Sequence, residues 1–117
     1  MQYMLMVYEG EESFAAREGE DGAAYWAAWK AYGDALQQAG VVAGGAALQP
    51  PLAATTVRTR EERRQVQDGP FAAAKEQLGG FFLIEVGDLD AALDWAGRCP
   101  VADDGGVEVR PVVPMVR

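Results

Sequence analysis

The sequence contains no histidine and only one cysteine, Cys99, among its 117 residues. Without histidine, the chain cannot form a Ser-His-Asp or Cys-His catalytic site, hold haem through histidine or supply the commonest zinc ligands. A single cysteine cannot make a disulfide within the chain, which favours a reducing compartment. We therefore predict no metal site, and we interpret Cys99 as a small core residue rather than a nucleophile.

Basic residues and long apolar runs are also scarce. Eighteen acidic residues against ten basic ones give a net charge of −8, which argues against binding to the phosphate backbone of nucleic acids. The apolar run at residues 3–8 is too short to span a bilayer and lacks the features of a signal peptide. No glycine run matches a phosphate-binding or dinucleotide-binding motif. We expect a cytoplasmic protein with no cofactor, no nucleic-acid partner and no membrane partner.

What is present fits one small domain covering residues 1–117. Hydrophobic residues make up 50% of the chain and charged residues 24%, as in ordinary globular domains. Surface scaling predicts roughly 6,200 Å² exposed after folding, from roughly 18,000 Å² in the unfolded chain. The chain can thus bury a core without disulfides or metals.

The spacing of apolar residues predicts strands and helices in mixed order. Apolar residues at helical spacing predict a helix over residues 23–39, and Asp88 is a suitable N-cap for a second helix that ends near residue 99. The other expected elements are a strand at 1–8, an acidic surface loop at 9–22, an ambiguous strand at 41–48, a polar hairpin at 54–60 and 64–68, one or two helical turns at 72–77, and strands at 81–86 and 107–113. This order predicts an α+β fold of the ferredoxin-like, split βαβ type, with an antiparallel sheet and two helices on one face.

Two helices can cover only one face of such a sheet, yet two of the strands carry large apolar side chains on both faces. These side chains alternate along residues 3–8 and 81–84. Burial of apolar surface stabilises a protein by roughly 25 cal/mol per Å². Leaving this face exposed to water would therefore cost many kcal/mol, against a total stability of only about 5–15 kcal/mol. We therefore expect a homodimer in which a second copy packs sheet to sheet.

A stretch in the second half of the chain carries a family resemblance. Asp68-Gly69-Pro70-Phe71 and Lys75-Glu76-Gln77-Leu78-Gly79-Gly80, followed by an apolar strand, closely resemble the DGPF-type branch of the YCII-related proteins. Further matches run nearly end to end, among them Gln49-Pro50-Pro51, Cys99-Pro100 and Val107-Glu108-Val109-Arg110-Pro111. The resemblance implies a dimeric α+β barrel.

The resemblance implies less about activity. A His–Asp pair is suggested for YCII-type relatives, with the histidine on the first helix and the aspartate just before a proline after the second helix. Here the first helix offers Tyr25 and Trp26, and Cys99 precedes Pro100, so both partners are missing. DGPF-type proteins also look like frequent companions of extracytoplasmic-function sigma factors. The resemblance therefore implies a regulatory setting, but it names no reaction.

The candidate catalytic residues are Asp68, Lys75 and Glu76. Asp68 either caps the turn that it begins or acts as a general base held at the mouth of the barrel. Glu76 either lies on a solvated helical turn or forms a carboxylate pair with Asp68, in which mutual repulsion raises one pKa. Lys75 either is solvated, neutralises one of these acids or holds an anionic ligand.

The candidate ligand-binding residues are Tyr8, Trp26, Phe71 and Arg110. The aromatic residues of the first helix either belong to the core or form a flat wall for a planar organic ligand, and Trp26 lies off the core-facing side. Phe71 is expected to anchor its turn in apolar surface. Arg110 lies among apolar residues and either forms an inter-strand or inter-subunit salt bridge or anchors a ligand.

Two hypotheses for function follow. In the first, a homodimer binds a small organic molecule near Asp68, Glu76 and Tyr8. As an enzyme it would transfer protons without a cofactor, with Asp68 or Glu76 as base and Lys75 or Arg110 steadying a developing oxyanion. In the second, the chain is a non-catalytic accessory protein of a sigma-factor system or another partner.

Overall fold

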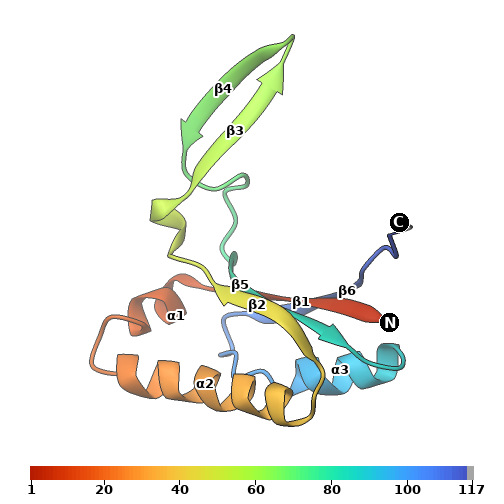
Figure 1. Ribbon diagram of the computed structural model, residues 1–117. Helices are drawn as coiled ribbons and strands as arrows, with labels where there is room; N and C mark the ends of the chain where they lie inside the picture. The colour runs from red at the N-terminus through yellow and green to blue at the C-terminus, as the bar shows by residue number, and fades with distance from the viewer. Residues whose placement is uncertain (116–117) are drawn as a thin grey trace.

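The computed structural model describes residues 1–115. Within them the chain forms a four-stranded sheet with helices on one side and a separate two-stranded hairpin on the other (Figure 1). The elements are β1 (Gln2–Glu9), α1 (Glu11–Ala16), α2 (Gly22–Gln38), β2 (Val42–Ala47), the 3₁₀ turn η1 (Pro51–Ala53), β3 (Thr55–Arg60), β4 (Arg63–Asp68), β5 (Gln77–Glu85), α3 (Leu89–Gly97) and β6 (Gly106–Pro111). The fold is α+β, as predicted.

The sheet has the strand order β2-β5-β1-β6, and every neighbouring pair is antiparallel. β1 and β2 are connected through α2 with β5 inserted between them, and β5 and β6 are connected through α3 with β1 between them. This is the split βαβ arrangement that the order of elements predicts. The sheet is open, and residues 1–115 form no closed barrel.

The core lies between the sheet and the two longer helices. Buried side chains such as Tyr3 and Leu5 alternate along β1 with partly exposed ones, because successive side chains of a strand point to opposite faces. From the helical side, Tyr32 and Leu36 of α2 pack into the same cluster. The Tyr32 hydroxyl also donates a 2.7 Å hydrogen bond to the carbonyl of Trp95, which ties α2 to α3.

The predicted surface loop at residues 9–22 is wrong. Glu9 is the last residue of β1 and is only 2% exposed, and the residues after it form α1, which buries Phe14. The prediction failed because the segment is acidic and contains a single large apolar side chain. The alternation of β1 nevertheless continues to Glu9 and places its carboxylate on the core side. A charge in that position requires a partner, and the residue directly after α1, Arg17, supplies it.

The helical predictions had mixed outcomes. Residues 72–77 form no helical turn, because Gln77 already begins β5 and its side-chain amide donates to two carbonyls of the preceding segment. The N-cap is confirmed, since the Asp88 carboxylate accepts a 2.9 Å hydrogen bond from the amide of Ala91. None of the helices within residues 1–115 is long and apolar enough to cross a membrane.

The sheet face turned away from the helices is apolar at its centre, as predicted, and we call it the open face. Its central side chains come from β1 and β5 and are half-buried: Met4, Met6, Tyr8, Phe81 and Leu83. The chain exposes 8268 Å² in total, about 2,100 Å² more than the roughly 6,200 Å² expected of a compact chain of this mass. The helices of the chain leave the open face uncovered (Figure 1).

Candidate functional site

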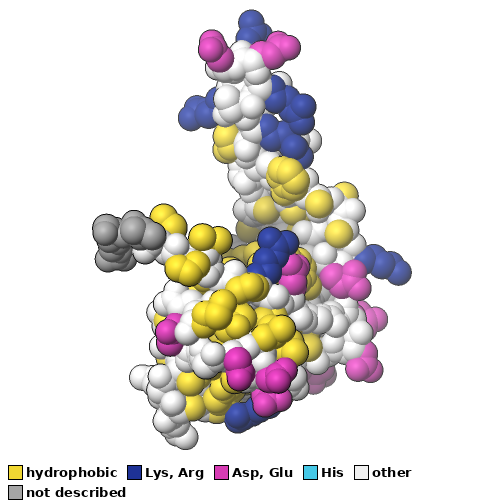
Figure 2. Space-filling view, turned by 90° about the vertical axis from the view of Figure 1, so that its right-hand side faces the viewer, with side chains coloured by type: hydrophobic (Ala, Val, Ile, Leu, Met, Phe, Trp, Pro, Cys, Tyr) yellow, Lys and Arg dark blue, Asp and Glu magenta, His cyan; other side chains and the backbone are white. Residues whose placement is uncertain are grey.

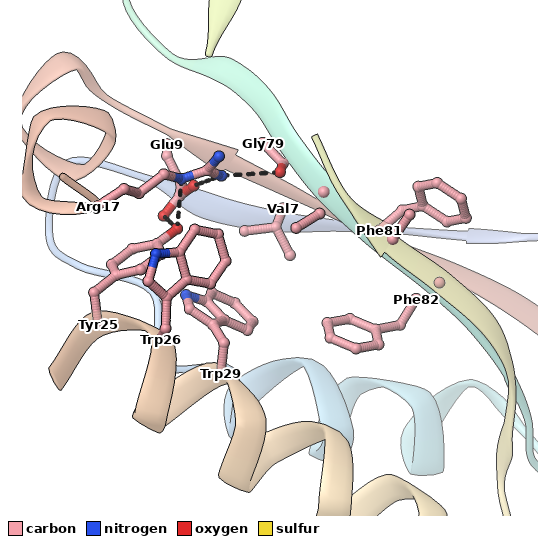
Figure 3. Close-up of a pocket in the computed structure, with 13 residues that line it drawn as sticks. Val7, Glu9, Arg17, Tyr25, Trp26, Trp29, Gly79, Phe81 and Phe82 are labelled. Carbon is pink, nitrogen blue, oxygen red and sulfur yellow. Dashed lines mark hydrogen bonds and ion pairs between the residues drawn. The ribbon is translucent and has the colours of Figure 1, made fainter. Parts of the chain in front are cut away.

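A partly open cavity of about 210 Å³ lies between α2 and the sheet, at the end of the sheet nearest α1 (Figure 3). The aromatic rings of Trp26, Trp29 and Phe82 form much of its wall. The strands β2 and β5 contribute only small residues over much of the opposite side: Gly45, Ala46, Ala47, Gly79 and Gly80. Small residues where the helix meets the sheet leave the space that larger side chains would fill. We call this space the aromatic cavity.

A buried ion pair forms the polar end of the aromatic cavity. Arg17 Nη2 lies 3.0 Å from Glu9 Oε1, and the two side chains are only 6% and 2% exposed. The Arg17 guanidinium also donates to the carbonyl oxygens of Leu48 and Gly79. A desolvated ion pair is retained only when such additional hydrogen bonds satisfy its remaining groups. The pair thus joins α1 to β1, β5 and the end of β2 at one point.

Tyr25 of α2 completes this polar end. Its hydroxyl donates a 2.6 Å hydrogen bond to Glu9 Oε2 and accepts one of 3.2 Å from Arg17 Nε. Each carboxylate oxygen of Glu9 therefore has its own donor. Burial and, next, the hydrogen bond to Glu9 raise the pKa of Tyr25 from 10.0 to about 12. The hydroxyl consequently keeps its proton at neutral pH.

Gly79 allows the ion pair to lie directly against β5. It is the one residue of a β-bulge in β5, because the register between β1 and β5 shifts at this point. A Cβ atom on Gly79 would lie 2.5 Å from Glu9 Oε1 and 3.1 Å from Arg17 Nη2. The position therefore accepts no side chain while the ion pair keeps its place.

Aromatic rings enclose the guanidinium of Arg17. Its central carbon lies 4.8 Å from the ring centroid of Phe14, 5.6 Å from that of Tyr25 and 5.2 Å from that of Trp26. These distances fall within the range of cation–π attraction. The aromatic rings and Glu9 together compensate the buried positive charge, so the polar end carries no uncompensated charge.

Trp29 holds the one buried side-chain nitrogen or oxygen atom within residues 1–115 that has no hydrogen-bond partner, its indole Nε1. Leaving a buried donor without an acceptor costs about 1–3 kcal/mol. Trp29 lines the aromatic cavity, and its ring stacks on that of Phe82 with 6.1 Å between the centroids. The N–H group of Trp29 thus lacks an acceptor in a residue of the cavity wall.

The Glu9–Tyr25 pair also borders a second space. An acidic hollow of about 400 Å³ lies against both residues, and Glu12 and Asp104 are among those that line it. Asp104 accepts a 2.8 Å hydrogen bond from the hydroxyl of Ser13, which fastens the loop before β6 to α1. The pair therefore stands between a largely apolar cavity and an acidic hollow.

The raised pKa of Tyr25 predicts a specific loss of stability in alkaline solution. Because the folded-state pKa lies above the ordinary value of 10.0, the contribution of Tyr25 is fully present below pH 10 and is lost as the pH rises through about 12. We expect urea unfolding to show a steeper fall in stability across this window for the native chain than for the Tyr25→Phe variant. Parallel pH profiles of the two proteins would contradict the raised pKa of Tyr25.

The structure places the candidate ligand-binding residues in different spaces. Trp26 lines the aromatic cavity. Tyr8, Phe71 and the candidate base Glu76 line a separate hollow of about 550 Å³ at the root of the hairpin. Phe71 is 71% exposed, so it does not anchor its turn in apolar surface as expected; its ring instead lies 4.3 Å below the guanidinium carbon of Arg58.

The other candidate residues lie on the surface. Asp68 is the exposed last residue of β4, and Lys75 is exposed between β4 and β5. Arg110 is exposed on β6 and donates a 2.5 Å hydrogen bond to Glu108 of the same strand, which raises the pKa of Arg110. None of these three residues lines the aromatic cavity or the hollow at the hairpin root.

Cys99 is buried, as predicted. It is 8% exposed, and burial raises the pKa of its thiol, which disfavours the nucleophilic thiolate. Within residues 1–115, no three His, Cys, Asp or Glu side chains are grouped so that they could hold a metal ion.

Sequence reasoning missed the two central residues of the site, Glu9 and Arg17. One available signal was the strict alternation of β1, which predicts that Glu9 shares a face with Tyr3 and Leu5. An acid on a core face must be paired, so the first arginine after it was the natural partner. The contact with Gly79 had no comparable signal, because it depends on a bulge in a strand 62 residues further along the chain.

Comparison with known proteins finds a family model and a relative that cover nearly the whole chain, and it leaves the chemistry open. The model of the YCII-related domain matches residues 1–116. An uncharacterised protein of Rhizobium meliloti (strain 1021) is 37% identical over 114 residues, which cover 96% of this chain and 92% of that protein.

Proposed function

The chain belongs to the YCII-related family, and we propose that it binds a small, largely apolar organic molecule in the aromatic cavity. The observation that carries the proposal is the lining of that cavity: indole and phenyl rings on one side, glycine and alanine on the other, and one neutralised polar end. Concave apolar pockets with a few convergent polar groups are typical of small-molecule sites.

The cavity restricts the chemistry of the ligand. A space of about 210 Å³ suits a molecule of the size of one or two fused rings, and the flat faces of Trp26 and Trp29 suit a planar one. The charges of Glu9 and Arg17 already compensate each other, so a charged ligand gains little there. The unpartnered N–H of Trp29 favours a ligand with one hydrogen-bond acceptor, such as an aromatic ketone.

Acid–base chemistry on a ligand in the aromatic cavity would use Glu9 and Tyr25 rather than the residues suggested by the sequence. The Tyr25 hydroxyl already donates a hydrogen bond to the Glu9 carboxylate, so the two groups lie together at the polar end of the cavity. Asp68 and Lys75 are exposed elsewhere, and Glu76 lines a different hollow. The function that the site supports best is therefore binding, with Glu9 and Tyr25 at the polar end of the cavity.

The binding protein in this proposal is a homodimer. The open face supports it, because Met4, Met6 and Phe81 lie on it half-exposed. Sheet-to-sheet packing of two copies is the arrangement that covers this face with an equally apolar surface.

Two probes that differ in one acceptor test the proposed ligand chemistry. Acetophenone carries a carbonyl oxygen, and ethylbenzene has nearly the same shape without it. We expect acetophenone to bind more tightly, by roughly tenfold, because it satisfies the indole N–H of Trp29. The measurement is a titration followed by the indole N–H resonances in ¹⁵N-correlated NMR, in which the Trp29 signal should move most.

Trp29→Phe is the matched variant, because it keeps an aromatic wall and removes the donor. It should bind the two probes equally, whereas Trp95→Phe, a change outside the cavity, should keep the preference for acetophenone. If neither probe shifts any cavity resonance at millimolar concentration, the binding proposal is wrong. If the native protein then recovered a sigma factor in an affinity pull-down, that result would favour the non-catalytic accessory role.

A further inference from the structure

The hairpin of β3 and β4 stands away from the rest of the molecule, and we call residues 55–68 the arm. Figure 1 shows the arm projecting from the side of the sheet that carries the open face, opposite the helices. The radius of gyration is 15.9 Å, against roughly 13.4 Å for a compact chain of this length. The projecting arm thus explains why the radius of gyration is larger than that of a compact chain.

The arm lacks the packing that a hairpin needs. An isolated two-stranded hairpin is marginally stable at best in water, yet all six residues of β4 are exposed. Val57 and Val66 lie directly opposite each other and are 56% and 59% exposed. The turn consists of Glu61 and Glu62, both with positive φ, a conformation that favours glycine or asparagine. Such a hairpin needs an external surface to keep its shape.

The arm is also the basic part of an acidic chain. Its four arginines and three carboxylates give the arm a charge of +1. Because the net charge of the whole chain is −8, the remaining residues carry −9. Arg60 lies directly opposite Arg63, a pairing of like charges that destabilises a hairpin. The ion pairs found within residues 1–115 involve none of the arm's arginines. Figure 2 shows Lys and Arg side chains along the arm, with hydrophobic side chains gathered at its root.

We propose that the arm docks on the acidic body of a second copy of this chain, each copy of the dimer clasping the other. The inference rests on the homodimer proposed above. A six-residue strand spans about 20 Å, while packed sheets lie about 10 Å apart. An arm that rises on the open-face side therefore extends past the sheet of a copy packed on that face and reaches its helical layer. Exposed carboxylates stand there on the body: Glu11, Glu12, Glu18, Glu20, Asp34, Asp90 and Asp94.

A second copy suits the arm better than other partners. The excess of acid over the whole chain repels nucleic acid, whereas the same excess on a second body attracts the arginines of the arm. The two-fold symmetry of a dimer satisfies both arms at once, so no basic hairpin is left exposed. Val57 and Val66 supply the apolar contact that such a docked hairpin needs.

Analytical ultracentrifugation of three proteins tests the docking. Thr55 and Asp68 face each other across the hairpin, so Asn-Gly can replace residues 56–67 as a two-residue turn. We expect this deletion to weaken dimerisation by at least roughly a hundredfold. Arg60→Glu combined with Arg63→Glu should weaken it by roughly tenfold and reduce its dependence on salt. Lys30→Glu combined with Arg98→Glu, an equal change of charge on the body, should not weaken it.

The outcomes separate the two proposals. A native chain that is monomeric at high concentration overturns both the dimer and the docking. A dimer whose affinity the deletion leaves unchanged overturns the docking alone. If circular dichroism shows that the deletion variant does not fold, a cross-linking experiment replaces it. A photoreactive phenylalanine is placed at Thr59, and ¹⁴N- and ¹⁵N-labelled chains are mixed to form dimers before irradiation. Cross-links between heavy and light chains support the docking, and cross-links only within one chain, or to nucleic acid, overturn it.

Discussion

Replacing Arg17 by methionine is expected to lower the free energy of unfolding by about 3–5 kcal/mol, because it leaves the Glu9 carboxylate buried without its cation. Glu9 is 2% exposed and its Oε1 atom has the Arg17 guanidinium as its ion-pair partner. Two backbone carbonyls, those of Leu48 and Gly79, lose a donor in the same variant. Against a total stability of about 5–15 kcal/mol, the loss should be plain in urea unfolding curves.

Two matched variants serve as controls for this result. Lys30→Met removes the exposed Lys30–Asp34 pair, whose side chains are 77% and 52% exposed, and should cost less than about 1 kcal/mol. Adding Glu9→Gln to Arg17→Met should restore part of the stability, since it removes the unpaired charge. An Arg17→Met protein as stable as the Lys30→Met protein would show that the ion pair does not hold the end of the sheet together.

Alanine at Gly79 is expected to destabilise the chain by about 1–3 kcal/mol through overpacking. The added methyl group would lie 2.5 Å from Glu9 Oε1 and 3.1 Å from Arg17 Nη2. Glu9 is too buried to move away freely, so the carboxylate and the guanidinium must separate or β5 must shift. Urea unfolding measures the cost, and the Trp29 indole resonance reports whether the wall of the aromatic cavity moves with it.

Gly44→Ala is the appropriate control, because it places the same methyl group on a neighbouring strand of the same sheet. There the new Cβ would lie 4.0 Å from the Cβ of Leu83, an ordinary contact. Its effect on stability should therefore be small. Equal losses from the two variants would mean that any alanine weakens this sheet and that Gly79 has no particular role at the ion pair.

Much of the fold could be predicted because its signals are local. The apolar residues of β1 and the helical spacing of Tyr32 and Leu36 are visible within short windows. The polar hairpin at residues 54–60 and 64–68 was predicted as well, and the structure shows it projecting from the sheet (Figure 1). The errors occurred where local composition and tertiary position disagree, as in the acidic segment after Glu9, which forms α1.

The candidate site was predicted less well. The sequence drew attention to Asp68 and Glu76 because of their motif, but the structure places Asp68 on the arm and Glu76 beside a different hollow. Trp26 was the one candidate that lines the aromatic cavity. The polar end of that cavity joins residues from β1, α1, α2 and β5, which no spacing along the chain brings together.

By itself, the sequence determined the order of strands and helices and the apolar character of both sheet faces, because these depend on patterns repeated every two or every three to four residues. Its motifs, rather than any periodicity, resemble those of the YCII-related family. Only the tertiary structure decided that Glu9 meets Arg17 and Tyr25, and that Gly79 makes room for them. A buried charge is stable only where several elements converge on it, and that convergence depends on a bulge and on helix–sheet packing rather than on neighbouring residues.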